Sequence, residues 1–328
     1  RARRDDCRRR RRQREDPVTD GVVAGPSGTR RPSLLTKVNS RAAIRAHRRV
    51  RSVLEGEYGS VHKGRSMDFD DLREYVDGDD IKDIDWKATA RSLNPLVKRF
   101  VAMRQHSVLL LVDTGKSMAA LADVESAKRD VAVMAAGIVA QLAARHGDLV
   151  SLVAGPADEA TSHGIIHLPP GKSKAHLERI LRAIHDNIDA DGAPSNLDSL
   201  YAYVIRTIRR RMIVLVIADD IAITDRQLGL LRRLHAQHEV LYCMVADVPL
   251  SAAPSGDVRI QGSGGGVPAF FRADRALTEQ LRSAGTQRAA ATSKTLQRIG
   301  IPSVRLTTED TVLTAVIELL ERQRRARR

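Results

Sequence analysis

The stretch LLLVDTGKSM, residues 109–118, places an acid, two hydroxyl side chains, a glycine and a lysine directly after an apolar run. Asp-Thr-Gly is typical of an aspartic protease, and Gly-Lys-Ser is typical of a phosphate-binding loop. An Asp followed four residues later by Ser-Met is typical of a metal-dependent adhesion site. These three chemistries differ, and each needs a second element elsewhere in the chain.

The first two interpretations lack that second element. An aspartic protease needs two carboxylates that share a proton, and the chain contains one Asp-Thr-Gly triplet. A phosphate-binding loop of the form G-x-x-x-x-G-K-[ST] needs a glycine where Leu110 stands. Without that glycine, the backbone N–H groups cannot wrap a phosphate.

The metal interpretation finds its partners on other predicted loops. Asp113 and Ser117 would be joined by Ser195, in GAPSNL, and by Asp219, in IADD. Mg²⁺ prefers six oxygen ligands and keeps several waters, so two carboxylates and two hydroxyls from separate loops suit it. The sequence therefore predicts that Mg²⁺ is a possible cofactor at these four residues, with one position open for a partner's carboxylate.

The elements that would position these residues form a regular alternation. Apolar strands near residues 110, 152, 215, 243 and 304 are separated by helical segments, which predicts an α/β fold with a mainly parallel, doubly wound sheet. In such sheets ligands bind at the carboxyl ends of the strands. Three of these ends are rich in acids, namely VDTGKS, IADDIAITD and MVADVPL. An Asp at such a position can also simply cap the next helix.

Composition divides the chain into four expected segments. Residues 1–32 read as a disordered basic tail, residues 33–104 as an N-terminal helix with a Gly- and Asp-rich segment, residues 105–322 as the α/β domain, and residues 323–328 as a basic tail. The N-terminal helix is expected to run from Leu34 to about Val53.

The Gly- and Asp-rich segment carries a specific signature. DFDDLREYVDGDDIKDIDWKATAR, residues 68–91, followed by LVKRF and LLLVDTGKSM, resembles the bacterial family known as domain of unknown function fifty-eight. In that family a REY, GD and IDW-x-x-x-A-R signature precedes a von Willebrand factor A-type domain. Later phrases such as AKRDVAVMAA and RHGDLVSLV extend the resemblance over about residues 50–250.

The resemblance implies a von Willebrand A-like fold and a metal-ion-dependent adhesion site of the pattern Asp-x-Ser-x-Ser, then Thr, then Asp. Family members are often encoded near MoxR-type AAA+ ATPases, so it also implies a non-enzymatic adaptor or scaffold that works with such an ATPase. This chain has Gly115 at the first Ser and Ser195 at the Thr, and Lys116 adds an ammonium beside the site. We expect the lost hydroxyl to weaken metal affinity.

The acids of the signature segment allow a second interpretation, because Asp77, Asp79, Asp80, Asp83 and Asp85 could suggest calcium. The EF-hand spacing fails, since Lys82 stands at the glycine position and Ala88 at the bidentate Glu. We expect these acids to cap turns and to pair with Arg73, Lys87 and Arg91, while Trp86 anchors the segment against the sheet. A partner-docking face is the alternative.

Two other function classes stay open. A metal-dependent hydrolase would use Asp113 with Asp219 or Asp220. A binder of nucleic acid or anionic surfaces would use the Arg-rich ends, which contribute to the formal net charge of +14. The two cysteines, Cys7 and Cys243, form no metal or disulfide pattern and favour the reducing cytoplasm, and no apolar run is long enough to span a bilayer.

Overall fold

The computed structural model describes residues 32–45, 67–92, 94–102, 106–156, 164–248 and 274–326. The helices in these ranges are α1 (Leu34–Arg45), α3 (Trp86–Thr89), α4 (Lys128–Arg145), α5 (Lys174–Asp186), α6 (Leu197–Thr207), α7 (Asp225–Gln237), α9 (Arg275–Arg298) and α10 (Val312–Ala326), with short 3-10 turns η1 (Ile81–Asp83) and η2 (Lys116–Ala119). The strands are β1 (Met67–Glu74), β2 (Leu96–Ala102), β3 (Ser107–Asp113), β4 (Leu149–Gly155), β5 (Ile166–Gly171), β6 (Ile213–Asp219), β7 (Glu239–Val245) and β8 (Ser303–Leu306). The predicted N-terminal tail and the second half of the helix expected from Leu34 to Val53 lie outside the described residues.

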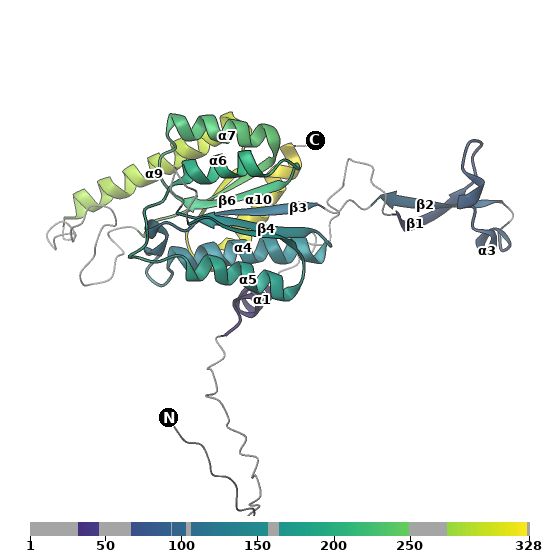
Figure 1. The fold of residues 1–328 in the computed structure, drawn as a ribbon, viewed down its shortest axis with the longest axis horizontal. Coiled ribbons are helices and arrows are strands. Elements are labelled where there is room, and N and C mark those ends of the chain that lie inside the picture. Colours follow the sequence, from purple (N-terminus) through teal and green to yellow (C-terminus); the bar gives the residue numbers. More distant parts are fainter. Residues whose placement is uncertain are drawn as a thin grey trace, which may run out of the picture. The chain divides into compact units, whose positions relative to one another are not determined.

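A six-stranded sheet of order β5-β4-β3-β6-β7-β8 forms the centre of the main domain (Figure 1). All neighbouring strands pair in parallel except β5, which runs antiparallel at one edge. The chain first builds outward from β3 through β4 to β5 and then returns to β3's other side with β6. This reversal between β3 and β6 is the topological switch point, where ligands bind in doubly wound sheets. The predicted α/β fold is confirmed.

Helices cover both faces of the sheet because successive strand residues point to opposite sides. Leu110 and Val112 of β3 pack into a core with α1, α4, α5 and α10. Leu109 and Leu111 pack into a second core with α6, α7 and α9. Strands β3 and β7 are buried at every residue, which explains why they read as continuous apolar runs.

Helix α4 begins later than its apolar pattern suggests. Its sequence stays helical in periodicity from Val124 onward, yet the chain makes a turn first, in which the N–H of Ala122 donates to the carbonyl of Ser126 (2.8 Å). The N–H of Lys128 then donates to the carbonyl of Ala120 (2.9 Å). These bonds fix Lys128 as the first helical residue, directly below the carboxyl ends of the strands. Gly147, with φ of 77°, stops the helix as predicted.

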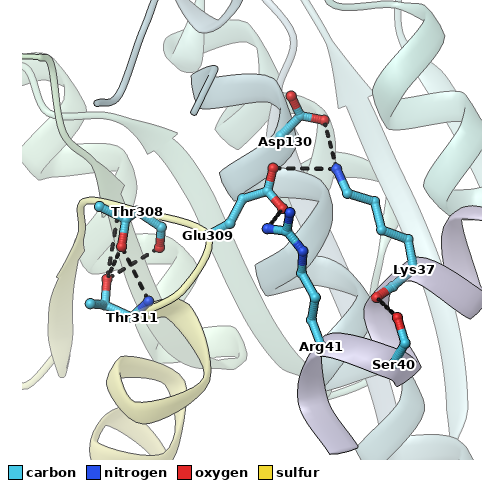
Figure 2. A network of polar contacts seen from close by, with 7 residues as sticks. All are labelled: Lys37, Ser40, Arg41, Asp130, Thr308, Glu309 and Thr311. Carbon is cyan, nitrogen blue, oxygen red and sulfur yellow. Dashed lines mark hydrogen bonds and ion pairs between the residues drawn. The ribbon is translucent and has the colours of Figure 1, made fainter. Parts of the chain in front are cut away.

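Helix α1 is held on α4 and α5 by packing and by charge. Val38 lies so close to Gly137 of α4 that a Cβ there would meet it at 2.7 Å. Lys37 and Arg41 converge on Glu309, which precedes α10, and Lys37 also reaches Asp130 of α4 (Figure 2). The described part of α1 therefore belongs to the main domain.

The N-terminus of α1 is capped by a carboxylate from α5. Glu178 accepts hydrogen bonds from the N–H groups of Leu34 (3.2 Å) and Leu35 (2.9 Å) and from the hydroxyl of Ser33 (2.9 Å). Partial burial alone would raise its pKa, but these three bonds and the nearby Arg182 guanidinium lower the pKa below its usual value of 4.5. A depressed pKa means that this contact stabilises the docked helix above pH 4.5 and is lost as the pH falls below it.

We expect Glu178→Gln to loosen α1 at neutral pH by about 1–2 kcal/mol, because a charge-assisted cap becomes a neutral one. Hydrogen exchange of the α1 amides at pH 7 would measure this, and the wild type should approach the variant's exchange behaviour only when the pH falls below 4.5. Equal protection of α1 in both proteins at pH 7 would show that Glu178 does not hold the helix.

Strands β1 and β2 form a separate antiparallel hairpin with an irregularity between Phe69 and Asp71. The predicted capping role is confirmed for two of the acids, since Asp80 caps η1 and Asp85 caps α3, and Asp79 pairs with Arg73 at 2.6 Å as predicted. Within the described hairpin, Asp85 pairs with Lys98 at 3.5 Å instead of with Lys87 or Arg91. The predicted anchoring role of Trp86 is wrong, because its side chain is 65% exposed. Trp86 opens the four-residue helix α3, which has no buried residue of its own to pack against the tryptophan.

The C-terminal helix is longer than expected. Helix α10 continues to Ala326, past the predicted start of a basic tail at residue 323. Ion pairs one turn apart, Glu318 with Arg322 and Glu321 with Arg325, line its last turns. No helix within the described ranges is long and apolar enough to cross a membrane.

Candidate functional site

The site lies where β3 and β6 end, at the switch point of the sheet. Asp113 is the last residue of β3 and is fully buried. One of its carboxylate oxygens accepts a hydrogen bond from the N–H of Gly115 at 2.8 Å, and the other accepts one from the hydroxyl of Ser195. Burial raises the pKa of Asp113 to about 6, although Ser195 and Gly115 favour its charged form.

Asp219, the last residue of β6, is paired with a lysine that the motif analysis did not include. The ammonium of Lys128 lies 2.6 Å from Asp219 Oδ1 and also pairs with Asp247, which follows β7. Lys128 is only 1% exposed, whereas the side chain of Asp247 is 52% exposed. Burial and the charge of Asp247 raise the pKa of Asp219, and Lys128 and the hydroxyl of Ser117 act in the opposite direction.

Loop packing explains why a glycine stands at position 115. A Cβ on Gly115 would lie 2.5 Å from both Cα and the backbone nitrogen of Ser195, which is far inside any real contact. The N–H of Lys116 donates to the carbonyl of Ala193 at 2.9 Å and ties the same two loops together. The loop that carries Ser195 therefore closes onto the loop after β3, and a serine at position 115 has no room.

The neighbouring acid at the end of β6 has a different partner. Asp220 is buried and accepts a hydrogen bond from Arg305 Nε of β8 at 2.7 Å. Its own N–H donates to the carbonyl of Val245. Asp220 thus ties β6 to the far edge of the sheet, and it is not free to act beside Asp113.

The four residues predicted from sequence do come together. Ser195 bonds to Asp113, Ser117 lies beside Asp219, and the charge of Asp219 is close enough to contribute to the raised pKa of Asp113. The sequence analysis missed Lys128. Helical phase gave no clear signal for it, because α4 is buried at every residue from Val131 to Ala140 and so has no single inward face.

These residues as arranged do not fit a resident divalent cation. The hydroxyl of Ser117 is buried and lies near enough to Asp219 to lower that acid's pKa, yet it makes no hydrogen bond of normal geometry, which leaves it available as a ligand. Against this, both oxygens of Asp113 already accept hydrogen bonds, Asp219 holds the Lys128 ammonium, and a second hydroxyl has no room at position 115. Within the described ranges, no three His, Cys, Asp or Glu side chains group closely enough to bind a metal ion.

Three exposed apolar side chains lie in the loops that follow β3 and β6, the strands that carry the acids of this cluster. Leu121 and Val124 lie in the loop between η2 and α4, and Ile221 lies in the loop after β6; all three are exposed. Val248, after β7, donates its N–H to the carbonyl of Leu121 at 3.0 Å, so the loops after β3 and β7 are joined. We call Leu121, Val124, Ile221 and Asp247 the strand-end rim.

A second exposed apolar set lies at the tip of the β1–β2 hairpin. Val76, Ile81 and Trp86 are all at least 60% exposed, and we call them the hairpin tip. The hairpin, residues 67–102, carries nine acidic against six basic side chains, a net charge of −3 in a chain of +14.

A six-stranded sheet with one antiparallel edge, helices on both faces and an acid-and-hydroxyl cluster at the switch point defines a von Willebrand A-like domain. The chain belongs to the family described as protein of unknown function DUF58, whose model matches residues 71–293. The match includes most of the β1–β2 hairpin and most of the domain.

Similar proteins occur in mycobacteria. Mb1516 of Mycobacterium bovis and Rv1480 of Mycobacterium tuberculosis are each 29% identical to this chain over 279 residues, which cover 83% of this chain and 84% of theirs. Among solved structures, an aerotolerance-related membrane protein from Bacteroides fragilis is 15% identical, with a TM-score of 0.43 over 66% of this chain and 99% of that one. A von Willebrand factor type A protein from Catenulispora acidiphila is 10% identical, with a TM-score of 0.35 over 70% and 44%.

Proposed function

We propose that this protein is a non-enzymatic adaptor that binds a protein partner at the carboxyl edge of its sheet. The observation that carries the proposal is the strand-end rim: three exposed apolar side chains in the loops after β3 and β6, and one half-exposed carboxylate that pairs with the buried Lys128. Exposed apolar patches with a polar border are typical of protein-binding surfaces. The buried cluster fixes the loops that carry the rim.

Binding accounts for the site better than catalysis does. A hydrolase would need carboxylates able to reach a substrate, but Asp113, Asp219 and Asp220 are each buried and engaged with protein donors. Burial raises the pKa of the Cys243 thiol to about 12, which leaves it unreactive. The cluster therefore supports a structural role beneath a docking surface.

We further propose a MoxR-type AAA+ ATPase as the partner and the cytoplasm as the location. The family resemblance supports the ATPase, and the sparse, unpatterned cysteines favour a reducing compartment. The Arg-rich ends are not needed for this function, since the rim lies within the described domain.

Capture of the purified ATPase tests the proposal. Val124→Asp places a charge in the rim without touching the core, and we expect at least a ten-fold loss of affinity, about 1.4 kcal/mol. The matched control is Leu281→Asp, which changes an equally exposed apolar side chain on α9 and should bind as the wild type does. Equal binding by Val124→Asp and wild type would remove the rim from the interface. If the wild type does not bind the ATPase at all, the partner's identity is wrong.

The hairpin tip is proposed as a second contact, for a partner surface that combines apolar and basic groups, because the hairpin is the acidic part of a basic chain. Trp86→Ala should change the free energy of unfolding by less than about 0.5 kcal/mol, since the side chain is exposed. Exposed tryptophans are frequent binding hot spots, so capture of the partner should weaken by about 2 kcal/mol. Leu281→Ala is the control, and an unchanged affinity in Trp86→Ala would exclude the tip.

A further inference from the structure

We infer that the Lys128 ammonium is the built-in cation of the strand-end site, in place of the divalent metal that the Asp-x-Ser-x-Ser pattern suggests. Wild-type protein would then bind neither Mg²⁺ nor Mn²⁺ at Asp113 and Asp219. The inference concerns the chemistry beneath the proposed docking surface. It is tested by metal titration and not by partner capture, so the two can fail independently.

The first support is the position of the ammonium. Lys128 opens α4, and its backbone N–H is fixed by the carbonyl of Ala120, so the side chain starts directly under the loops after β3. Its Nζ lies 2.6 Å from Asp219 Oδ1 and pairs with Asp247, which follows β7. The ammonium thus bridges the ends of β6 and β7 with one positive charge.

The second support is charge balance. A lysine that is 1% exposed stays charged only with carboxylate partners close by. Here it has two, and its charge also favours the ionised form of Asp113. A divalent ion bound to the same carboxylates would be repelled by the ammonium, and displacing that ammonium would bury it without a partner.

The third support is that the remaining oxygen groups are too few or too engaged to attract a metal while the ammonium is present. Asp113 accepts hydrogen bonds at both oxygens, from Gly115 and Ser195. Position 115 cannot supply a hydroxyl, because the Ser195 backbone occupies the space. Each Asp113 oxygen accepts one hydrogen bond and keeps a second lone pair. Removal of the lysine is therefore the change that should reopen the site, with Asp219, Ser117 and these lone pairs of Asp113 as the remaining oxygen groups.

Isothermal titration of Mn²⁺ and Mg²⁺ into wild type and Lys128→Ser is the test. We expect no saturable metal binding by the wild type. Lys128→Ser should bind with a Kd at least ten-fold below the weakest Kd that the titration can detect, and its Tm should rise when Mn²⁺ is added. Two controls should remain without binding: Lys128→Arg, which keeps the positive charge, and Lys116→Ser, which removes the other lysine of the motif.

Two results would overturn the inference. One is saturable Mn²⁺ binding by the wild type that Asp219→Asn abolishes. The other is a folded Lys128→Ser protein that gains no binding. If Lys128→Ser folds only when Mn²⁺ is present, the inference is supported. If Lys128→Ser does not fold at all, the titration of the wild type decides: Mn²⁺ binding that depends on Asp219 contradicts the inference, and the absence of such binding agrees with it.

Discussion

Lys128→Met is expected to lower the free energy of unfolding by about 3–5 kcal/mol, because it leaves a buried carboxylate without its cation. Methionine keeps most of the side-chain volume, so lost packing contributes little. The loss comes from Asp219, which remains buried with only the N–H of Asp220 as a donor to the same oxygen, at 2.8 Å. Urea unfolding of both proteins at neutral pH measures the difference.

A double variant separates this electrostatic cause from a packing defect. Lys128→Met with Asp219→Asn removes both charges and should recover most of the stability, because a buried neutral pair has no unpaired ion. The exposed pair of Arg282 and Glu279 on α9 is the matched control, and Arg282→Met should leave the free energy of unfolding nearly unchanged, because water screens this pair. A loss below 1 kcal/mol in Lys128→Met, or no recovery in the double variant, would contradict the pairing.

Gly115→Ser is the second large effect, and it should destabilise the protein by about 3 kcal/mol through overpacking. The backbone at Gly115 has φ of −62°, which any residue can adopt, so strain in the dihedral angles plays no part. The cost arises because a Cβ would meet the Ser195 backbone at 2.5 Å. Urea unfolding of the wild type and of Gly115→Ser measures this difference in the free energy of unfolding.

The controls for Gly115→Ser follow from the same contacts. A Cβ added at Gly229 in α7 would meet no atom within 4 Å. Gly229→Ser should therefore leave the free energy of unfolding unchanged or raise it by up to about 0.5 kcal/mol. Adding Ser195→Gly to Gly115→Ser should recover little, since the clash is with the Cα and nitrogen of residue 195. A Gly115→Ser protein as stable as the wild type that also bound Mg²⁺ would contradict this account. It would show that the glycine only removes a hydroxyl ligand and is not required by packing.

The strands were predictable because their apolar runs are long and buried on both faces, as in β3 and β7. The antiparallel direction of β5 was not, since a short run such as IHLPPG, with exposed positions and two prolines, shows an edge strand but no direction. The predicted start of α4 was too early, because the helical pattern of apolar residues extends back into the preceding turn. That turn is closed by the backbone hydrogen bond from the N–H of Ala122 to the carbonyl of Ser126.

The site was predictable in its carboxylates and not in its cation. Asp113 and Asp219 follow apolar runs, so topology alone brings them to one edge. Lys128 lies 15 residues after Asp113 within an Ala-rich helix, and only the depth of its burial shows that it faces inward. Sequence reasoning chose Lys116 because it is adjacent in the motif, yet no ion pair joins Lys116 to either acid in the part of the chain that the structure describes.

The exposure of Trp86 could not be predicted because a tryptophan is more often partly buried than not. In the hairpin, the residues around it are charged, and Val97 is the only side chain of the described hairpin residues in the hydrophobic core set. Among the hairpin side chains that the structure describes, Val76, Ile81 and Trp86 are turned outward, and this supports the partner-docking alternative for the signature segment.

The most direct test of the account is capture of the purified MoxR-type ATPase by wild type and Asp113→Asn, each in excess Mg²⁺ and in EDTA. Asparagine can still accept from the N–H of Gly115, and its NH2 group can donate to the Ser195 hydroxyl in place of the bond that Asp113 accepts there, while the charge that helps fix the loops is removed. We predict that the wild type binds with equal affinity in Mg²⁺ and EDTA and that Asp113→Asn binds more weakly in both. Loss of wild-type binding in EDTA, or equal binding by Asp113→Asn, would contradict a metal-free docking edge at this site.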